Sequence, residues 1–193
     1  MEFVADEIAT EEEYLARERA SLDRHEYVDR RIVAMAGGSP RHNFISANVA
    51  AVLRSLLGGR CRAFSSDQRI FVPATGLYTY PDVAVVCGPP ELHPRHPDTI
   101  TNPRVVVEVL SKSTEAYDRG DKFSHYRTVP SLLGYLIVAQ RERHIEHYRR
   151  VEVGRWELTE AVGDGAITVP ALDLVLPLGD VYAAVDDLPG DDG

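Results

Sequence analysis

An acidic residue stands in the middle of an apolar run over residues 104–110, which reads RVVVEVL. The run has the composition of a strand buried on both faces, so Glu108 would be removed from water. A buried carboxylate is costly unless a cation or hydrogen-bond donors compensate it, or unless its pKa rises. The sequence therefore predicts a partner for Glu108, and a metal ion is the partner that would use this carboxylate for chemistry.

Asp82 is the second acid in a suitable position, because it opens the run DVAVVC, which predicts a strand over residues 82–87. If this strand neighbours that of Glu108, the two carboxylates converge on one divalent cation, since Mg²⁺ and Mn²⁺ prefer oxygen ligands. Each acid also has a purely structural interpretation. Asp82 could bond its own backbone in a turn, and Glu108 could pair with Arg69 or Arg104.

The cationic residues are almost all arginine. Lysine and arginine together number 21, but the only lysines are Lys112 and Lys122, and both follow Glu108 closely. A compact ammonium whose pKa shifts readily can do what a broad guanidinium cannot, so a role beside the acids is one interpretation and chance is the other. Lys122 could also be a solvated helix residue that pairs with Asp118 at i−4.

These residues must be positioned by elements that the sequence pattern predicts. Thr10 and Glu13 resemble a capping box for a helix to residue 20, and HEYVD and RIVAMA predict a hairpin turning near residues 29–31. Ser39-Pro40 begins an apolar helical pattern that Gly58-Gly59 ends. The proline-rich segment 88–103 is expected to be irregular. The remaining expectations are strands at 61–64, 69–72, 82–87, 104–110, 133–139, 144–149 and 156–160, and helices at 114–128 and 178–185.

These elements predict a mixed α/β (α+β) fold with a largely antiparallel sheet flanked by helices. The chain, with 193 residues and 44% hydrophobic content, suits one main domain over 25–185, a helical extension over 1–24 and a flexible acidic tail over 186–193. No segment resembles a signal peptide or a membrane span, which predicts a cytoplasmic protein. Cys61 and Cys87 lack a metal-type spacing and are expected to be free buried thiols.

The order of these motifs resembles the PD-(D/E)XK nuclease superfamily, and more closely its Uma-type family of restriction endonucleases. The matching features are Pro81-Asp82, Glu108 in an apolar strand, EVLSKST, Asp121-Lys122 and Tyr126, together with Glu26, His42 and Ser66-Asp67. The likeness extends from about Glu12 to Tyr182. It implies a restriction-endonuclease-like fold and a metal-dependent phosphodiester hydrolase site.

The sequence departs from the superfamily pattern at Leu110, where the (D/E)XK lysine would stand two residues after the acid. The family resemblance implies that the lysine has moved to the following helix, at Lys122. Strand parity offers Lys112 as a rival, because it shares a face with Glu108 if the strand continues that far. Lys122 is favoured, since the strand is expected to end near residue 111.

The resemblance implies a mechanism in which Asp82, Glu108 and the backbone carbonyl near Val109 hold one Mg²⁺ or Mn²⁺. The metal would polarise the phosphate and lower the pKa of a bound water, while Lys122 orients the water or neutralises charge on phosphorus. Glu26 is a secondary candidate that could bind or position the metal. His42 is another and could contact a phosphate or the water, although it is also simply a first-turn helix residue.

The predicted function is a metal-dependent DNA endonuclease, which could be a homodimer because double-strand cleavage needs two sites. The net charge of −9 gives no general attraction to a polyanion, so DNA binding would need a local basic patch. Two alternatives remain: a noncatalytic binding or regulatory module with the same fold, and a hydrolase of RNA or nucleotides. The residues expected in a basic patch are Arg41, Arg60, Arg62, Arg119, Arg127 and the two lysines.

Overall fold

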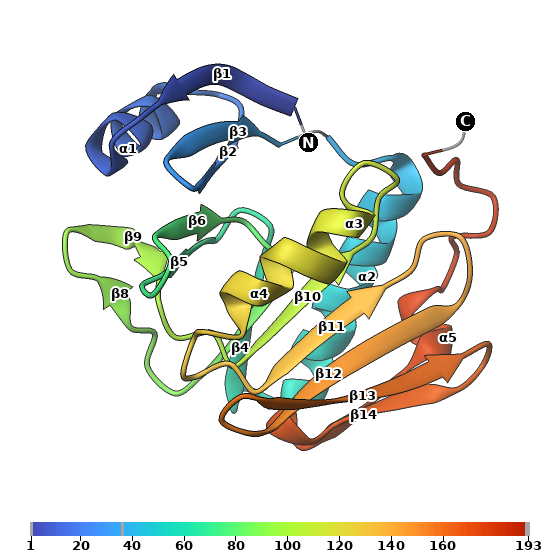
Figure 1. The fold of residues 1–193 in the computed structure, drawn as a ribbon. Helices are drawn as coiled ribbons and strands as arrows, with labels where there is room; N and C mark the ends of the chain where they lie inside the picture. Colours follow the sequence, from blue (N-terminus) through green and yellow to red (C-terminus); the bar gives the residue numbers. More distant parts are fainter. Residues whose placement is uncertain (1, 36, 192–193) are drawn as a thin grey trace.

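The structure, a computed structural model, describes residues 2–35 and 37–191. Within them lie two mixed sheets and a small hairpin (Figure 1). The first sheet has the strand order β1-β3-β2-β6-β5-β9-β8. Its strands are β1 (Glu2–Ile8), β2 (His25–Val28), β3 (Arg31–Ala34), β5 (Arg69–Val72), β6 (Leu77–Thr79), β8 (Leu92–His93) and β9 (His96–Ile100).

The second sheet has the order β13-β12-β11-β10-β7-β4. Its central strands β10 and β11 are parallel, and the other pairs are antiparallel. These strands are β4 (Cys61–Ser65), β7 (Val83–Cys87), β10 (Val105–Val109), β11 (Gly134–Val138), β12 (His144–Glu152) and β13 (Arg155–Val162), and the separate hairpin pairs β14 (Ala166–Val169) with β15 (Leu174–Pro177).

The helices cover both faces of the second sheet (Figure 1). One face carries α2 (Pro40–Leu57) and α5 (Leu178–Val181), and the other carries a helix built of α3 (Glu115–Tyr117), the π turn η1 (Asp118–Lys122) and α4 (Phe123–Tyr126). The short 3₁₀ turn η2 (Pro170–Leu172) joins β14 to β15, and α1 (Glu11–Ala20) lies beside the first sheet. Every helix in the described residues is too short or too polar to cross a bilayer.

Local signals begin and end the main helices as the sequence predicted. Thr10 and Glu13 form the complete capping box of α1. Ser39 caps α2 and Gly58 ends it in the left-handed region with φ 55°. Ile45, Val49, Leu53 and Leu57 of α2 are buried, whereas the apolar Phe44 and Leu56 of the same helix are exposed.

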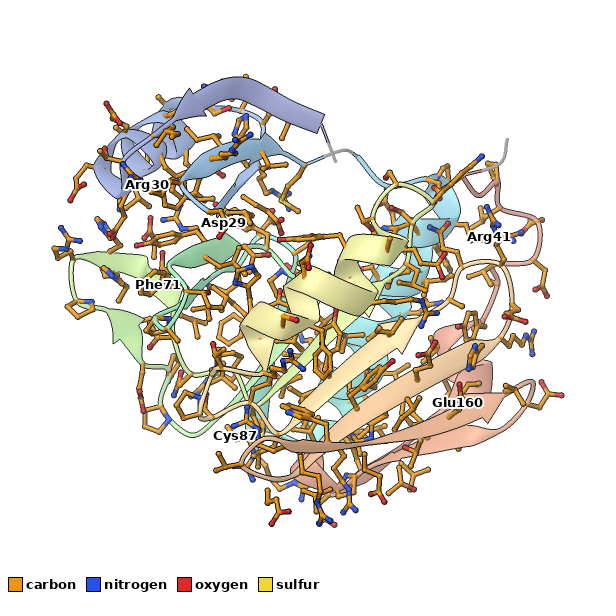
Figure 2. All side chains as sticks on the ribbon, in the orientation of Figure 1. Asp29, Arg30, Arg41, Phe71, Cys87 and Glu160 are labelled. Atoms are coloured by element: carbon orange, nitrogen blue, oxygen red, sulfur yellow. A yellow bond between two sulfur atoms is a disulfide. The ribbon has the colours of Figure 1, made fainter. Side chains whose placement is uncertain are left out.

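The predicted hairpin of β2 and β3 turns at Asp29 and Arg30, which both have positive φ (48° and 65°; Figure 2). Two consecutive positive φ values are typical of the type I′ turn, whose twist matches that of the flanking strands. The turn fixes the register so that Glu26 lies opposite Val33. Glu26 is thereby directed into the protein, where it is buried.

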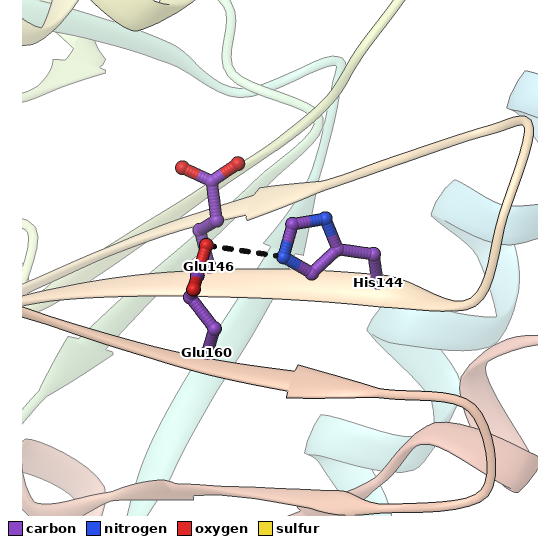
Figure 3. A group of neighbouring side chains, drawn as sticks. All are labelled: His144, Glu146 and Glu160. Carbon is purple, nitrogen blue, oxygen red and sulfur yellow. Dashed lines mark ion pairs between the residues drawn. The ribbon is translucent and has the colours of Figure 1, made fainter.

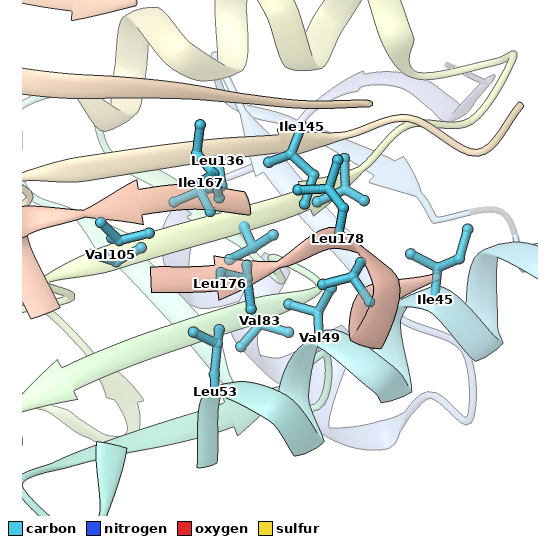
Figure 4. Close-up of a cluster of buried hydrophobic side chains, with 14 of the residues drawn as sticks. Ile45, Val49, Leu53, Val83, Val105, Leu136, Ile145, Ile167, Leu176 and Leu178 are labelled. Atoms are coloured by element: carbon cyan, nitrogen blue, oxygen red, sulfur yellow. The ribbon is translucent and has the colours of Figure 1, made fainter. Parts of the chain in front are cut away.

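Strand parity in β10 positions the central acid. Val105, Val107 and Val109 enter the large core between the second sheet and α2, part of which Figure 4 shows. Val106 and Leu110 instead enter a second core that contains Tyr126 and Tyr135. Because side chains alternate along a strand, Glu108 points to this second face, beneath the helix that carries Lys122.

Several expectations about elements were wrong. The proline-rich segment 88–103 contains β8 and β9. Of its prolines, Pro97 lies in β9, where the pairing with the edge strand β8 is irregular, and the others lie outside these two strands. The strands β1, β6, β14 and β15 were not expected at all. The helix predicted at 178–185 stops at Val181. The division of the chain at residues 24 and 185 stays a prediction.

The two cysteines form a disulfide, so the expectation of free thiols was wrong. Cys61 of β4 and Cys87 of β7 are directly opposite each other in the antiparallel pair, with Cα atoms 4.2 Å apart. Sequence alone could not show that their strands are neighbours, because β5 and β6 lie between them in the chain. The disulfide links β4, the edge strand of the second sheet, to the interior strand β7.

Replacing both cysteines with serine should lower the free energy of unfolding by about 3 kcal/mol, because the bond closes a loop with a sequence separation of 26. Urea denaturation of the parent and the double variant would measure the change. Dithiothreitol should lower the free energy of unfolding of the parent to nearly that of the variant, and it should leave the free energy of unfolding of the variant unchanged. Equal stability of the oxidised parent and the variant would contradict this prediction.

Candidate metal-dependent nuclease site

Glu108 is buried in the centre of the second sheet, with 3% of its surface exposed. Its Oε1 accepts a hydrogen bond from the Tyr126 hydroxyl at 2.9 Å and lies 3.0 Å from the Lys122 Nζ. Among the described residues, its charged partner is thus a lysine and not the arginine that the structural interpretation required. Tyr126 and Lys122 are one turn apart on the same helix, so one element supplies both partners.

The Lys122 ammonium is surrounded by carboxylates. Besides Glu108, its Nζ lies 3.4 Å from Glu26 Oε1 and 3.5 Å from Asp118 Oδ1. Burial alone would lower the pKa of Lys122, but the three acids raise it well above its usual value. The amine is therefore a fixed cation at neutral pH.

The π turn Asp118–Lys122 places this amine. Asp118 and Lys122 are both buried, and the Tyr135 hydroxyl donates to the Asp118 carbonyl at 2.9 Å. A π turn inserts one residue into the usual helical spacing and often occurs at functional sites. Lys112, the rival lysine, is exposed, and β10 ends at Val109, so the strand that would carry Lys112 beside Glu108 is not formed.

Asp82, which directly precedes β7, lies next to the end of β10. Its Oδ2 accepts the backbone N–H of Val109 at 2.8 Å and lies 3.4 Å from His42 Nε2. The same His42 nitrogen is 3.0 Å from the Val109 carbonyl oxygen, to which it donates when protonated. Burial would lower the pKa of His42, but Asp82 outweighs it and raises this pKa to about 9. His42 therefore joins Asp82 to the Val109 peptide.

A cavity of about 460 Å³ opens beside these groups. Asp82, Glu108, Asp118, Lys122 and His42 line one wall. The lining also includes residues from the N-terminal part of the chain, among them Leu22, Arg24, Met35, Gly37 and Gly38. The predicted acids and the lysine are thus brought together at one solvent-connected surface.

Glu26, like Lys112, is a predicted candidate that does not line this cavity. It lies behind Lys122, where it accepts a short hydrogen bond from the Thr79 hydroxyl. Asp118 does line the cavity, but the sequence suggested only that it pairs with Lys122. The i, i+4 spacing of the two residues was the available signal, and it could not show that Asp118 is 98% buried.

The donor set fits a hard divalent cation. Three carboxylates, those of Glu26, Glu108 and Asp118, surround the Lys122 amine, and Asp82 lines the same cavity beside His42. The acids therefore outnumber the local cations even when His42 is charged. The buried Oδ1 of Asp118 has no hydrogen-bond partner within the described part of the chain. Mg²⁺ and Mn²⁺ take such oxygens as ligands.

The stability of the metal-free protein should fall as the pH rises from about 5 to 8. Burial raises the pKa of Glu108 from 4.5 to about 8, against the opposing effect of Lys122. Because the folded state then holds its proton more tightly, stability is fully present below pH 4.5 and is lost as the pH rises to about 8. Urea denaturation in EDTA measures this dependence. MnCl₂ should restore more stability at pH 8 than at pH 5, and a flat profile would contradict the assignment.

A different cluster of possible metal ligands lies on β12 and β13, on the face of the second sheet that carries the Lys122 helix. His144, Glu146 and Glu160 place their ligand atoms within 4.8 Å of one another (Figure 3). Hydrogen bonds and ion pairs within the protein account for this cluster without a metal ion. One carboxylate oxygen of Glu146 accepts a hydrogen bond from Arg119 at 2.5 Å, and the other accepts one from the Tyr148 hydroxyl at 3.1 Å. Glu160 pairs with His144 at 3.3 Å.

Only some of the arginines that were predicted to form a basic patch lie near the candidate site. Arg41 and Arg119 line a second cavity next to the first. Arg60 follows the far end of α2 and pairs with Asp173 at 3.4 Å. Arg62 lies there as well, on β4, and donates to a backbone carbonyl. The helix spans roughly 27 Å at 1.5 Å per residue, so neither arginine is near His42.

The comparisons with known proteins agree with this architecture. The chain matches the family model Uma2, described as "Putative restriction endonuclease", over residues 11–179. Two proteins of Synechocystis sp. (strain ATCC 27184 / PCC 6803 / Kazusa), both described as uncharacterized, are similar to it. The protein sll1609 is 36% identical over 160 residues, 82% of this chain and 90% of its own length. The protein slr1290 is 38% identical over 172 residues, 89% of this chain and 90% of its own length.

A solved structure from Anabaena variabilis ATCC 29413, described as "a putative nuclease belonging to DUF820", has a similar fold. The TM-score is 0.70, with 86% of this chain and 93% of that chain covered, and 17% of the aligned residues are identical. At that identity the likeness shows the fold alone, which is the mixed α+β nuclease fold that the sequence predicted. The family match extends over every catalytic candidate, and the chain accordingly belongs to the Uma2 family of restriction-endonuclease-like proteins.

Proposed function

We propose that this protein is a metal-dependent endonuclease that hydrolyses phosphodiester bonds in DNA, with Mg²⁺ or Mn²⁺ as its cofactor. The observation that carries the proposal is the convergence of Asp82, Glu108 and Asp118 with the Lys122 ammonium on one cavity. The family and the fold of the chain support a nuclease.

Asp82 and Glu108 are suited to hold the metal because hydrogen bonds orient one oxygen of each. The Val109 N–H fixes Oδ2 of Asp82, while Lys122 and Tyr126 fix Oε1 of Glu108. Both carboxylates therefore present a set geometry to the cavity before any ligand binds, which lowers the cost of binding. The Val109 carbonyl is a further candidate ligand, although His42 already contacts it.

The bound ion would supply Lewis acidity and lower the pKa of a coordinated water. Lys122 lies 3.0 Å from Glu108 and lines the cavity, where it can orient the attacking water or neutralise charge that develops on the phosphate. His42 positions Asp82 and the Val109 peptide. Glu26 acts behind the site by holding the Lys122 amine.

A noncatalytic binding module with the same fold is the alternative. Such a module does not need Asp82, Glu108 and Lys122 to lie close together. Distances of more than about 10 Å between these three residues would have favoured the module. Here Lys122 contacts Glu108, and Asp82 bonds the residue that follows Glu108. This proximity supports the catalytic proposal over the module.

Asp82→Asn should slow Mg²⁺- or Mn²⁺-dependent DNA cleavage by about 10²-fold, because the amide keeps the shape of the side chain but loses the charge that attracts the ion. Plasmid, single-stranded DNA and RNA should be tested as substrates, with EDTA controls. Asp121→Asn is the matched control, since Asp121 is an exposed aspartate on the turn that carries Lys122. Cleavage that is equal in the parent and Asp82→Asn would point to contamination or to another site.

A single catalytic site hydrolyses one DNA strand at a time. A homodimer would bring two such sites together and could cleave both strands. Native mass spectrometry with and without a short DNA duplex would report the number of chains in the assembly. A monomer that nicks plasmid without linearising it would show that a dimer is not required.

A further inference from the structure

Residues 186–191 run across the N-terminal end of α2 and are held there by Arg41, which Figure 2 labels. The Arg41 backbone N–H donates to the Pro189 carbonyl at 3.2 Å. Its guanidinium donates to the carbonyls of Leu188 at 2.9 Å and Asp186 at 3.2 Å. Because these bonds go to backbone carbonyls, they fix the path of the segment without using its acidic side chains.

The Asp191 carboxylate at the end of this path is held by two N–H donors. Its Oδ2 accepts the Lys112 backbone N–H at 2.9 Å and the Gln140 side-chain amide at 3.0 Å. Lys112 follows β10 and Gln140 follows β11, so both donors lie just beyond the C-terminal ends of two parallel strands. In α/β sheets this is a common position for ligands.

The surroundings of Asp191 favour an anion. Burial would raise the pKa of Asp191, but hydrogen bonds from the Lys112 backbone, Ser39 and Gln140, together with nearby His42, lower it below its ordinary value. Gln140 is itself 92% buried and also donates to the Leu110 carbonyl at 2.6 Å. These donors therefore belong to a built position that stabilises a negative charge.

This position lies between two cavities. Asp191 and Ser111 line both the catalytic cavity and the second cavity, which has a volume of about 350 Å³. A nucleic-acid strand that leaves the catalytic cavity in this direction would meet Asp191 first and then the basic lining. The basic residues that line the second cavity are Arg41, Lys112, Arg119 and Arg141, and the acids Glu115 and Glu142 line it as well.

A phosphodiester carries the same single negative charge as a carboxylate, and its two non-bridging oxygens accept the same N–H donors. We propose that the Lys112 N–H and the Gln140 amide form a subsite for a backbone phosphate of the bound strand, and that Asp191 occupies this subsite when nucleic acid is absent. The subsite rests on the proposed nuclease function, since it would hold the strand whose neighbouring phosphate is cleaved. The segment 186–191 would then compete with the substrate.

Asp191→Ala empties the subsite and should tighten binding of a fluorescein-labelled DNA strand about tenfold at low salt, as measured by anisotropy in EDTA. The slope of log affinity against log salt should change little, because the two N–H donors are uncharged and release no counterion from the phosphate. Asp187→Ala is the matched control, since Asp187 is an exposed acid of the same segment. It should leave the affinity and the slope near those of the parent. Adding Gln140→Ala to Asp191→Ala should cancel most of the gain.

Inorganic phosphate, titrated by calorimetry, tests the subsite without any cleavage. Asp191→Ala should bind phosphate more tightly than the parent and Asp187→Ala. Equal affinity of the three proteins for phosphate and for DNA would overturn the subsite, even if the parent cleaves DNA. A gain for Asp191→Ala in a protein that cleaves nothing with Mg²⁺ or Mn²⁺ would support the subsite and overturn the nuclease proposal.

Discussion

Glu108→Gln should lower the rate of Mg²⁺-dependent DNA cleavage by about 10³-fold while leaving the protein folded. Glutamine keeps the shape of the side chain and can still accept the Tyr126 hydrogen bond, but it cannot offer a charged oxygen to the ion. The metal-free variant should be no less stable than the parent at pH 8, because the substitution removes a buried acid whose pKa is raised to about 8.

Single-turnover cleavage, Mn²⁺ titration calorimetry and urea denaturation measure the three properties separately. Glu152→Gln is the control, since Glu152 is an exposed glutamate of β12 in the same sheet. The control should match the parent in all three measurements. Cleavage by Glu108→Gln within tenfold of the parent would remove Glu108 from the proposed mechanism.

Lys122→Met should both inactivate and destabilise the protein. Removal of the amine leaves Glu108, Glu26 and Asp118 without their shared counterion, and losing one partner of a buried ion pair costs about 3–5 kcal/mol. For a chain of this size, that change lowers Tm by about 10 °C. Cleavage should fall by about 10²-fold or more when it is measured below the unfolding transition.

The stability lost in Lys122→Met should be smaller at pH 5 than at pH 8, because burial raises the pKa of Glu108 and Asp118 and both acids take up protons more readily at the lower pH. Lys112→Met is the matched control, as it removes the other lysine of the chain from an exposed position. Thermal unfolding of both variants at the two pH values tests this prediction. If Lys112→Met lost more activity than Lys122→Met, the lysine beside the strand would be the catalytic one.

The sequence predicted elements whose determinants are local. Thr10 and Glu13 lie three residues apart and Ser39 directly precedes its helix, so short-range hydrogen bonds decide where α1 and α2 begin. The burial of Glu108 could also be predicted, since its apolar neighbours leave the strand no exposed face. The local sequence pattern left both Lys112 and Lys122 open as the lysine beside Glu108, and the family resemblance favoured Lys122.

The features that were missed depend on contacts between distant segments. The Cys61–Cys87 disulfide forms because β4 and β7 are neighbouring strands, and β1 is a strand because it pairs with β3. Asp118 could not be recognised as part of the cavity, because helical spacing alone does not show which face the π turn buries. Asp191 was expected in a flexible tail, yet its contacts are made with loops after β10 and β11.

The Lys122 ammonium contacts carboxylates from both sheets, Glu26 on β2 of the first and Glu108 on β10 of the second. These ion pairs therefore also join the first sheet to the second. A motion that separates the two sheets would have to break buried ion pairs, so the sheets should move least relative to each other at Lys122.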